Sequence, residues 1–175
     1  MEKIYVQFAD ATEKTIASVF GAPQDPEVYA NLGEIDDADP RYLAFAKPEA
    51  TLPGAQAAQV AKISAACAAA LVAGFASSAL GAARTYPSQD TDQGNLFSAV
   101  LAAQEQPSTW VTSLWCASDG SWSLAPHDAE QVKQVNADWL AFRQSAQQKY
   151  ADLLEQINAA KTIAAVLAVS WTKPQ

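Results

Sequence analysis

His127 is the only histidine in the chain of 175 residues, so a histidine-dependent triad, a Cys–His dyad or a histidine metal site would have to use it. It lies between Pro126 and the start of a segment with helical periodicity. At that position we expect a surface residue rather than a general base. The chain has no glycine-rich phosphate loop, no G-x-S-x-G serine motif and no H-E-x-x-H zinc motif. The residues therefore predict a protein that is not an enzyme and that uses no cofactor or metal ion.

Carboxylates are the second kind of residue that could do chemistry. Residues 33–40 (GEIDDADP) are rich in aspartate, but they lack the ligand spacing and the closing glutamate of an EF-hand. We interpret them as a solvated acidic loop. A glycosidase would need a carboxyl group in an apolar setting that raises its pKa, whereas Glu105 and Glu155 are flanked by glutamines on polar helix faces. The carboxylates therefore give no support to a hydrolase.

The two cysteines, Cys67 and Cys116, occupy unlike contexts. Cys67 lies in an alanine-rich helical segment, which favours a small buried thiol, and Cys116 follows an aromatic strand. Whether they form a disulfide is left undecided by the sequence, but two isolated cysteines do not indicate a secreted disulfide scaffold.

Charge and hydropathy narrow the possible partners. The formal net charge of −8 argues against binding to a nucleic-acid backbone, which requires clustered Lys and Arg. The opening residues lack the pattern of a signal peptide, and we expect no apolar stretch of the roughly 18–20 residues that a membrane span needs. The sequence predicts a cytoplasmic protein that does not enter a membrane.

The strongest structural signal lies between about Asp128 and Ala160, where larger residues recur at spacings of three and four. This spacing places them along one stripe of an α-helix, with a polar opposite face and Asp128 as the N-cap. A helix of this length suits packing against a partner or a second copy of the chain, so a homo-oligomer is one possibility. The stripe consists of Val132, Val135, Trp139, Phe142, Ala146, Tyr150, Leu153 and Ile157.

Three tryptophans gather on one expected hairpin just before this helix. Residues 110–116 and 121–125 read as strands joined by Ser118-Asp119-Gly120, a turn of the type that favours tight hairpins. Two interpretations stay open for Trp110, Trp115 and Trp122. The rings either fill the space between the hairpin and the long helix, or form an exposed platform that binds a partner.

The remaining elements complete an α+β chain. Residues 3–8 and 14–20 read as paired strands, 41–45 as a helical turn or strand, 54–73 and 90–104 as helices, and the stretches around Gly81 as two short strands or a loop. We expect a small N-terminal β-hairpin lobe (1–50), followed by a mainly helical domain (51–175) with the tryptophan-bearing hairpin and the long C-terminal helix. Thr162 is expected to cap a last short helix.

Two stretches resemble proteins encoded beside bacteriophage tail-fibre genes. "KIYVQF…KTIASVFGAPQDPEVY…GEIDDADPRYLAF" (3–45) is similar to the N-termini of short tail-fibre assembly proteins and related prophage tail proteins. From about Ala57 to Trp171 the chain resembles the DUF4376 type of domain, a family of unassigned function found in phage and prophage tail proteins. The residues that carry this second resemblance are Gly74, Phe75, Ser77, Ser78, Ala79, Leu80, Gly81, Tyr86, Pro87, Asp92, Gln93, Asn95 and Leu96.

The resemblance implies a role in tail assembly and supplies no catalytic residues. The leading hypothesis is a tail-fibre assembly chaperone that binds the receptor-binding tip of a tail-fibre protein and helps it fold and trimerise. The alternative is a structural tail component that stays in the virion. For Asp92, Gln93 and Asn95, helix caps and buried hydrogen bonds are one interpretation, and a site that reads the partner is the other.

Overall fold

The computed structural model describes residues 2–107, 109–172 and 174. The predicted α+β class is confirmed, with a small N-terminal sheet, a second sheet and a long C-terminal helix. The chain divides into two compact units. Unit 1 comprises residues up to Ala61 together with 156–169, and unit 2 comprises 62–155 together with the segment from Ser170 onwards.

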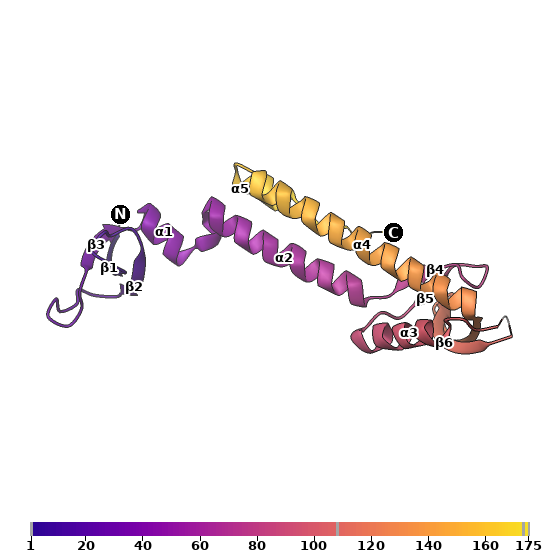
Figure 1. Ribbon diagram of the computed structural model, residues 1–175. Helices are drawn as coiled ribbons and strands as arrows, with labels where there is room; N and C mark the ends of the chain where they lie inside the picture. Colours follow the sequence, from indigo (N-terminus) through magenta and orange to yellow (C-terminus); the bar gives the residue numbers. More distant parts are fainter. Residues whose placement is uncertain (1, 108, 173, 175) are drawn as a thin grey trace. The chain divides into compact units, whose positions relative to one another are not determined.

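Unit 1 begins with a three-stranded antiparallel sheet in the order β2-β1-β3 (Figure 1). Its strands are β1 (Lys3–Phe8), β2 (Ile16–Phe20) and β3 (Leu32–Asp36), so the predicted strand pair is present. The expectation of an acidic loop at 33–40 is wrong for its first half, because β3 pairs with β1 from Lys3–Asp36 to Gln7–Leu32. Lys3 forms an ion pair with Glu34 across these strands, which makes the acidic side chains compatible with a strand.

The sheet of unit 1 buries Val6, Phe8 and Ile16 as a small apolar core. Residues 41–45, predicted as a helical turn or strand, belong to the helix α1 (Pro40–Ala46), which the 3-10 turn η1 (Pro48–Ala50) follows. Asp39 caps α1 and forms an ion pair with Arg41 at 2.7 Å. The Arg41 guanidinium lies over the Phe8 ring, 4.9 Å from its centroid, and fixes α1 to the sheet.

The helical part of unit 1 combines the first half of α2 (Leu52–Val72), the end of α4 (Ala129–Ala159) and α5 (Ile163–Ala168). Side-chain amides tie these segments together: Gln56 donates to the Ile157 carbonyl at 2.9 Å, and Gln59 donates to the Val169 carbonyl. Thr162 caps α5 as predicted, by accepting a hydrogen bond from the Ala165 amide.

The expectation that no segment is long and apolar enough for a membrane span needs correction. By length and composition alone, α2 meets the criterion for such a span. The long run of alanine and valine accounts for this, although Lys62 lies near its middle and Gln56 and Gln59 bond to other parts of unit 1. A core helix of a soluble protein meets the same criterion, so this finding is weak evidence for a membrane span.

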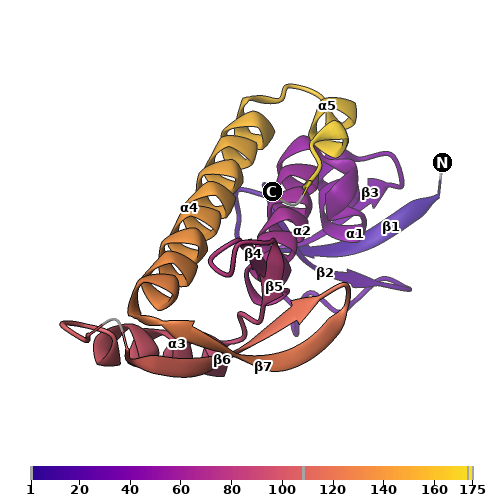
Figure 2. The same cartoon turned by 90° about the vertical axis from the view of Figure 1, so that its right-hand side faces the viewer.

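Unit 2 contains a four-stranded antiparallel sheet in the order β4-β5-β6-β7. The stretches around Gly81, predicted as two strands or a loop, are the strands β4 (Phe75–Ser77) and β5 (Arg84–Tyr86). The predicted hairpin is longer than expected and comprises β6 (Val111–Ser118) and β7 (Ser121–Asp128), seen with α3 (Asp90–Ala102) in Figure 2. Asp119 and Gly120 both have positive φ, as a type I′ turn requires.

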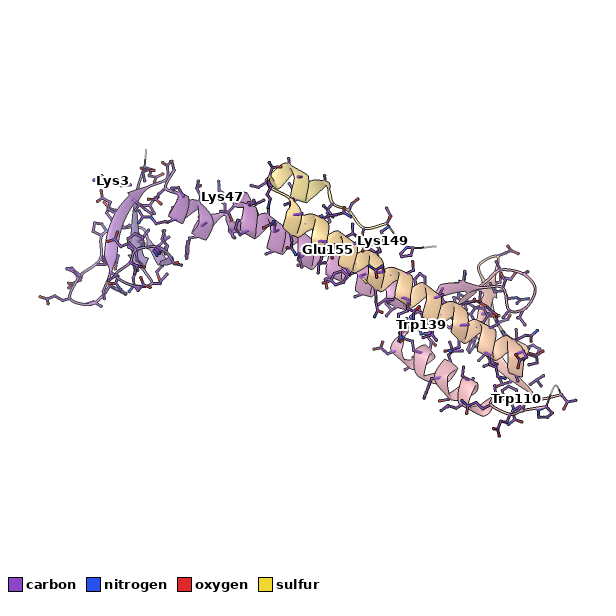
Figure 3. All side chains as sticks on the ribbon, turned by 45° about the horizontal axis from the view of Figure 1, so that its top comes forward. Lys3, Lys47, Trp110, Trp139, Lys149 and Glu155 are labelled. Atoms are coloured by element: carbon purple, nitrogen blue, oxygen red, sulfur yellow. The ribbon has the colours of Figure 1, made fainter. Side chains whose placement is uncertain are left out.

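The stripe predicted for α4 is confirmed, since seven of its eight residues are buried and Tyr150 is partly buried. Asp128 caps the helix as expected: its carboxylate accepts from the Gln131 amide, and the Gln131 side chain accepts from the Asp128 amide. Trp139, labelled on α4 in Figure 3, lies in the main core of unit 2. The buried residues of this core are Phe75, Tyr86, Leu96, Cys116, Val135, Trp139 and Phe142.

Gly74 makes the turn from α2 into β4. Its φ is +90°, and a Cβ atom at this position would lie 2.8 Å from the Tyr86 carbonyl oxygen. The buried Ser88 hydroxyl accepts from the Gly74 amide at 2.9 Å and donates to the Leu71 carbonyl at 2.7 Å. Any residue other than glycine would strain this turn and push β4 away from β5.

We therefore expect Gly74→Ala to lower the free energy of unfolding by about 2 kcal/mol or more, because it combines positive-φ strain with a backbone clash. Gly94→Ala is the matched control, since Gly94 lies within α3 with open space around its Cβ position. That exchange should raise stability by about 0.5–1 kcal/mol. Urea unfolding measures both values, and a neutral Gly74→Ala would contradict the account of this turn.

Candidate functional site

His127 is buried with an exposed fraction of 0%, so the expectation of a surface histidine is wrong. Its Nδ1 lies 2.9 Å from the Ala125 carbonyl oxygen, which can only accept, so Nδ1 carries the proton. Nε2 is then the acceptor for the Tyr86 hydroxyl at 2.8 Å. Burial lowers the pKa of His127 and raises the pKa of Tyr86 to about 12. Both groups are held neutral and join β5 to β7 inside the core.

The alternation of β7 explains why His127 points inward. Side chains of successive strand residues face opposite sides, and Ala125 and His127 share the side that packs on the core. Pro126 and Leu124 share the other side. The sequence reasoning missed this because it ended the strand at residue 125, whereas β7 continues to Asp128. Alternation then places His127 on the same side as Ala125, but it does not reveal which side of the hairpin is buried.

The opposite side of the hairpin is apolar and exposed to solvent. In the β6–β7 register Trp115 lies opposite Leu124, and Ala117 lies opposite Trp122. We call Val111, Trp115, Trp122 and Leu124 the outer hairpin face; their exposed fractions are 62, 53, 51 and 55%. Large apolar side chains clustered in this way on a surface are typical of sites that contact another macromolecule.

Trp110 does not belong to the outer hairpin face. It immediately precedes β6 and is partly buried against Ala103, Ala129 and Val132. Figure 3 labels this tryptophan. The three tryptophans thus do not form one group. Trp110 fills space beside the long helix, while Trp115 and Trp122 lie together on an exposed surface.

A groove of about 380 Å³ adjoins the outer hairpin face. One wall is β6 from Thr112 to Trp115, the other is α3, and Val135 lies at the bottom. Pro87 lines the end where the chain leaves β5 and turns into α3. Sequence reasoning could not detect the groove, because its two walls become neighbours only when β5 and the hairpin pair.

A family model described as "Domain of unknown function (DUF4376)" matches residues 54–170, well over half of the chain. The chain belongs to the DUF4376 family. No curated protein and no solved structure matches it. The DUF4376 match includes all of unit 2 up to Glu155, and therefore both the outer hairpin face and the groove.

Six of the motif residues that suggested the DUF4376 resemblance fall into three structural groups. Gly74, Phe75 and Tyr86 build the junction of β4 and β5, where the two rings stack with centroids 5.7 Å apart. Asp92 and Gln93 bond at the start of α3: Asp92 accepts from the Gln89 amide, and Gln93 donates to the Ser88 carbonyl. A further motif residue, Asn95, is exposed and lines the groove.

Among the described residues, no three His, Cys, Asp or Glu side chains gather in a geometry that could hold a metal ion. Cys67 and Cys116 are both free and buried, and burial raises the pKa of the Cys67 thiol. The buried thiol expected at Cys67 is therefore confirmed.

The buried His127 gives a pH dependence with a definite sign. Because its pKa in the folded chain lies below the ordinary value of 6.5, the unfolded chain binds the proton more readily. We expect the free energy of unfolding to be highest above pH 6.5 and to fall as the pH drops below that value. Urea unfolding between pH 7.5 and 5 measures the change.

His127→Gln is the control, because it retains a polar side chain but does not titrate in this range. The fall between pH 6.5 and 5 should be absent from the variant, since the chain has no second histidine. An identical pH dependence in both proteins would show that His127 is not the responsible group.

Proposed function

We propose that this DUF4376 protein is a non-enzymatic binding protein that acts as a bacteriophage or prophage tail-fibre assembly chaperone in the host bacterial cytoplasm. The observation that carries the proposal is the outer hairpin face, whose four large apolar side chains are more than half exposed. A partner that covers this face would remove that apolar surface from water.

The kind of partner follows from the charge and from the resemblance of the N-terminal stretch. The net charge of −8 does not favour a nucleic acid. Tryptophans on an open sheet face are typical anchors of protein–protein contacts, because they bury a large area at a small cost in side-chain entropy. The resemblance of residues 3–45 to tail-fibre assembly proteins identifies the receptor-binding tip of a tail-fibre protein as the partner that we propose.

Co-expression with the tail-fibre protein of the same phage or prophage genome tests this function. We expect SDS-resistant fibre trimers to form only when the chain is present. If the fibre trimerises equally well alone, the chaperone function is wrong. The chain would then be sought by mass spectrometry in purified particles, where fibre-like stoichiometry would indicate a structural tail component.

Two alanine variants locate the contact. Trp122→Ala removes an exposed anchor, so we expect trimer yield to fall by roughly tenfold or more while the free energy of unfolding changes by less than about 0.5 kcal/mol. Trp110→Ala is the matched control on the packed side and should lower the free energy of unfolding by about 2 kcal/mol. Equal losses of stability in the two variants would contradict the assignment of the outer hairpin face.

A further inference from the structure

The edge of β6 that faces the groove has main-chain groups without a strand partner. In an antiparallel pair, alternate residues of a strand direct both their N–H and C=O groups toward the same neighbour. The two-residue turn makes Ser118 and Ser121 the first hydrogen-bonded pair, so Cys116 and Leu114 also bond toward β7. Ala117, Trp115 and Ser113 therefore direct their backbone groups to the opposite side.

Pro126 supports this assignment independently. It lies opposite Ser113 in the register, and proline has no N–H to donate. The Ser113–Pro126 pair is thus a non-hydrogen-bonded pair, and the N–H and C=O of Ser113 point away from β7. On that side β5 pairs with β6 only at Thr85–Ala117, so no described strand occupies the place beside Ser113 and Trp115.

The groove lies along this open edge. Four consecutive residues of β6, from Thr112 to Trp115, line it. Successive side chains of a strand point to opposite faces, so four in a row line one groove only when it runs along the strand edge. Pro87 ends β5 at the other side and directs the chain into α3, which leaves the line of β5 vacant beyond Tyr86.

Exposed strand edges are usually blocked by a lysine, a proline, a bulge or a covering element, because they pair readily with other chains. The open stretch of β6 from Thr112 to Trp115 contains no charged residue and no proline. The edge at the other side of the hairpin differs, because β7 is the last strand of the sheet and carries Pro126 on its unpaired side. The outer edge of β7 thus carries a proline that hinders the addition of another strand, whereas the edge of β6 at the groove carries no such residue.

The charge of the groove and of the whole chain indicates what kind of polypeptide could bind in the groove. Asp92 is the one charged residue among the described residues that line the groove, and it projects from the first turn of α3. Its Oδ2 atom accepts from the Gln89 amide at 3.1 Å. The net charge of −8 disfavours a second acidic copy of this chain and favours a segment with a basic side chain.

We propose that the groove binds an extended polypeptide segment of the partner, which adds as a strand to the open edge of β6 and places a lysine or arginine beside Asp92. Main-chain hydrogen bonds to Ser113 and Trp115 supply the register, and Asp92 supplies the preference for positive charge. The paired part of the segment is about four residues long, because it lies opposite the four residues of β6 from Thr112 to Trp115 that line the groove. This inference rests on the proposed function in that the partner is a protein.

The test uses a labelled peptide of about eight residues that alternates valine with lysine or threonine, titrated against the full chain by fluorescence anisotropy. Two isomers carry N-methyl groups on one or the other set of alternate residues, which removes N–H donors on a single edge. We expect one isomer to bind roughly tenfold or more weakly than the parent, and the other to bind equally well. A peptide with glutamate in place of lysine should also bind more weakly.

Substitutions in the chain give the matched comparison. Ser113→Pro removes the N–H that points into the groove and should weaken binding roughly tenfold, whereas Ser113→Ala retains this donor and should bind like the parent chain. Asp92→Asn keeps an acceptor for the Gln89 amide and should lose the preference for lysine over glutamate. Circular dichroism establishes that the variants fold.

Three results overturn the proposal. The first is equal binding of both N-methyl isomers, which means that strand addition does not occur. The second is no peptide binding at all. The third is a dimer of the chain that Ser113→Pro converts to a monomer, which makes a second copy the occupant. If the peptide does not bind while fibre trimers still depend on the chain, only the groove assignment is lost; if the peptide binds and trimers form without the chain, only the chaperone function is lost.

Discussion

The hydrogen bond between the Tyr86 hydroxyl and His127 is the contact on which the geometry of unit 2 depends. It joins β5 to β7 across a sheet in which β5 and β6 share a single register pair. The Tyr86 ring stacks on Phe75, which in turn contacts Trp139 at a centroid distance of 5.3 Å. Because both polar groups are buried, losing either one leaves the other without a partner at a cost of about 1–3 kcal/mol. The position of β5, and with it the start of α3 and the groove, follows from this contact.

Local sequence signals were sufficient for the parts of the fold that depend on local physics. The spacing of apolar residues in α4 requires only the helical repeat, and it identified the buried stripe from Val132 to Ile157. The Asp119-Gly120 dipeptide identified the hairpin because few residues adopt two successive positive φ angles. Asp128 and Thr162 were recognised as caps because the bonds that they make are to amides three residues away.

The features that sequence reasoning missed depend on partners far along the chain. His127 can be buried because the hydroxyl of Tyr86, 41 residues earlier in the chain, donates a hydrogen bond to its Nε2 atom. The acidic stretch at 33–36 becomes a strand because β1 supplies backbone partners and Lys3 offsets Glu34. Which face of the hairpin is exposed could not be predicted either, since Leu114 and Cys116 on one side are as apolar as Val111 and Trp115 on the other. With both faces apolar, alternation carries no information about the inside.

The outer hairpin face has a consequence for how this family could diversify. Its side chains are largely exposed, so they contribute little to the folding free energy, whereas Cys116 and His127 on the reverse side are fully buried. If the proposed partner binds this face, recognition and folding depend on alternate residues of the same two strands. Under the proposed function, substitutions of these four exposed side chains can change which partner binds without removing contacts of the buried core, so that one scaffold can follow a binding partner that changes rapidly in evolution.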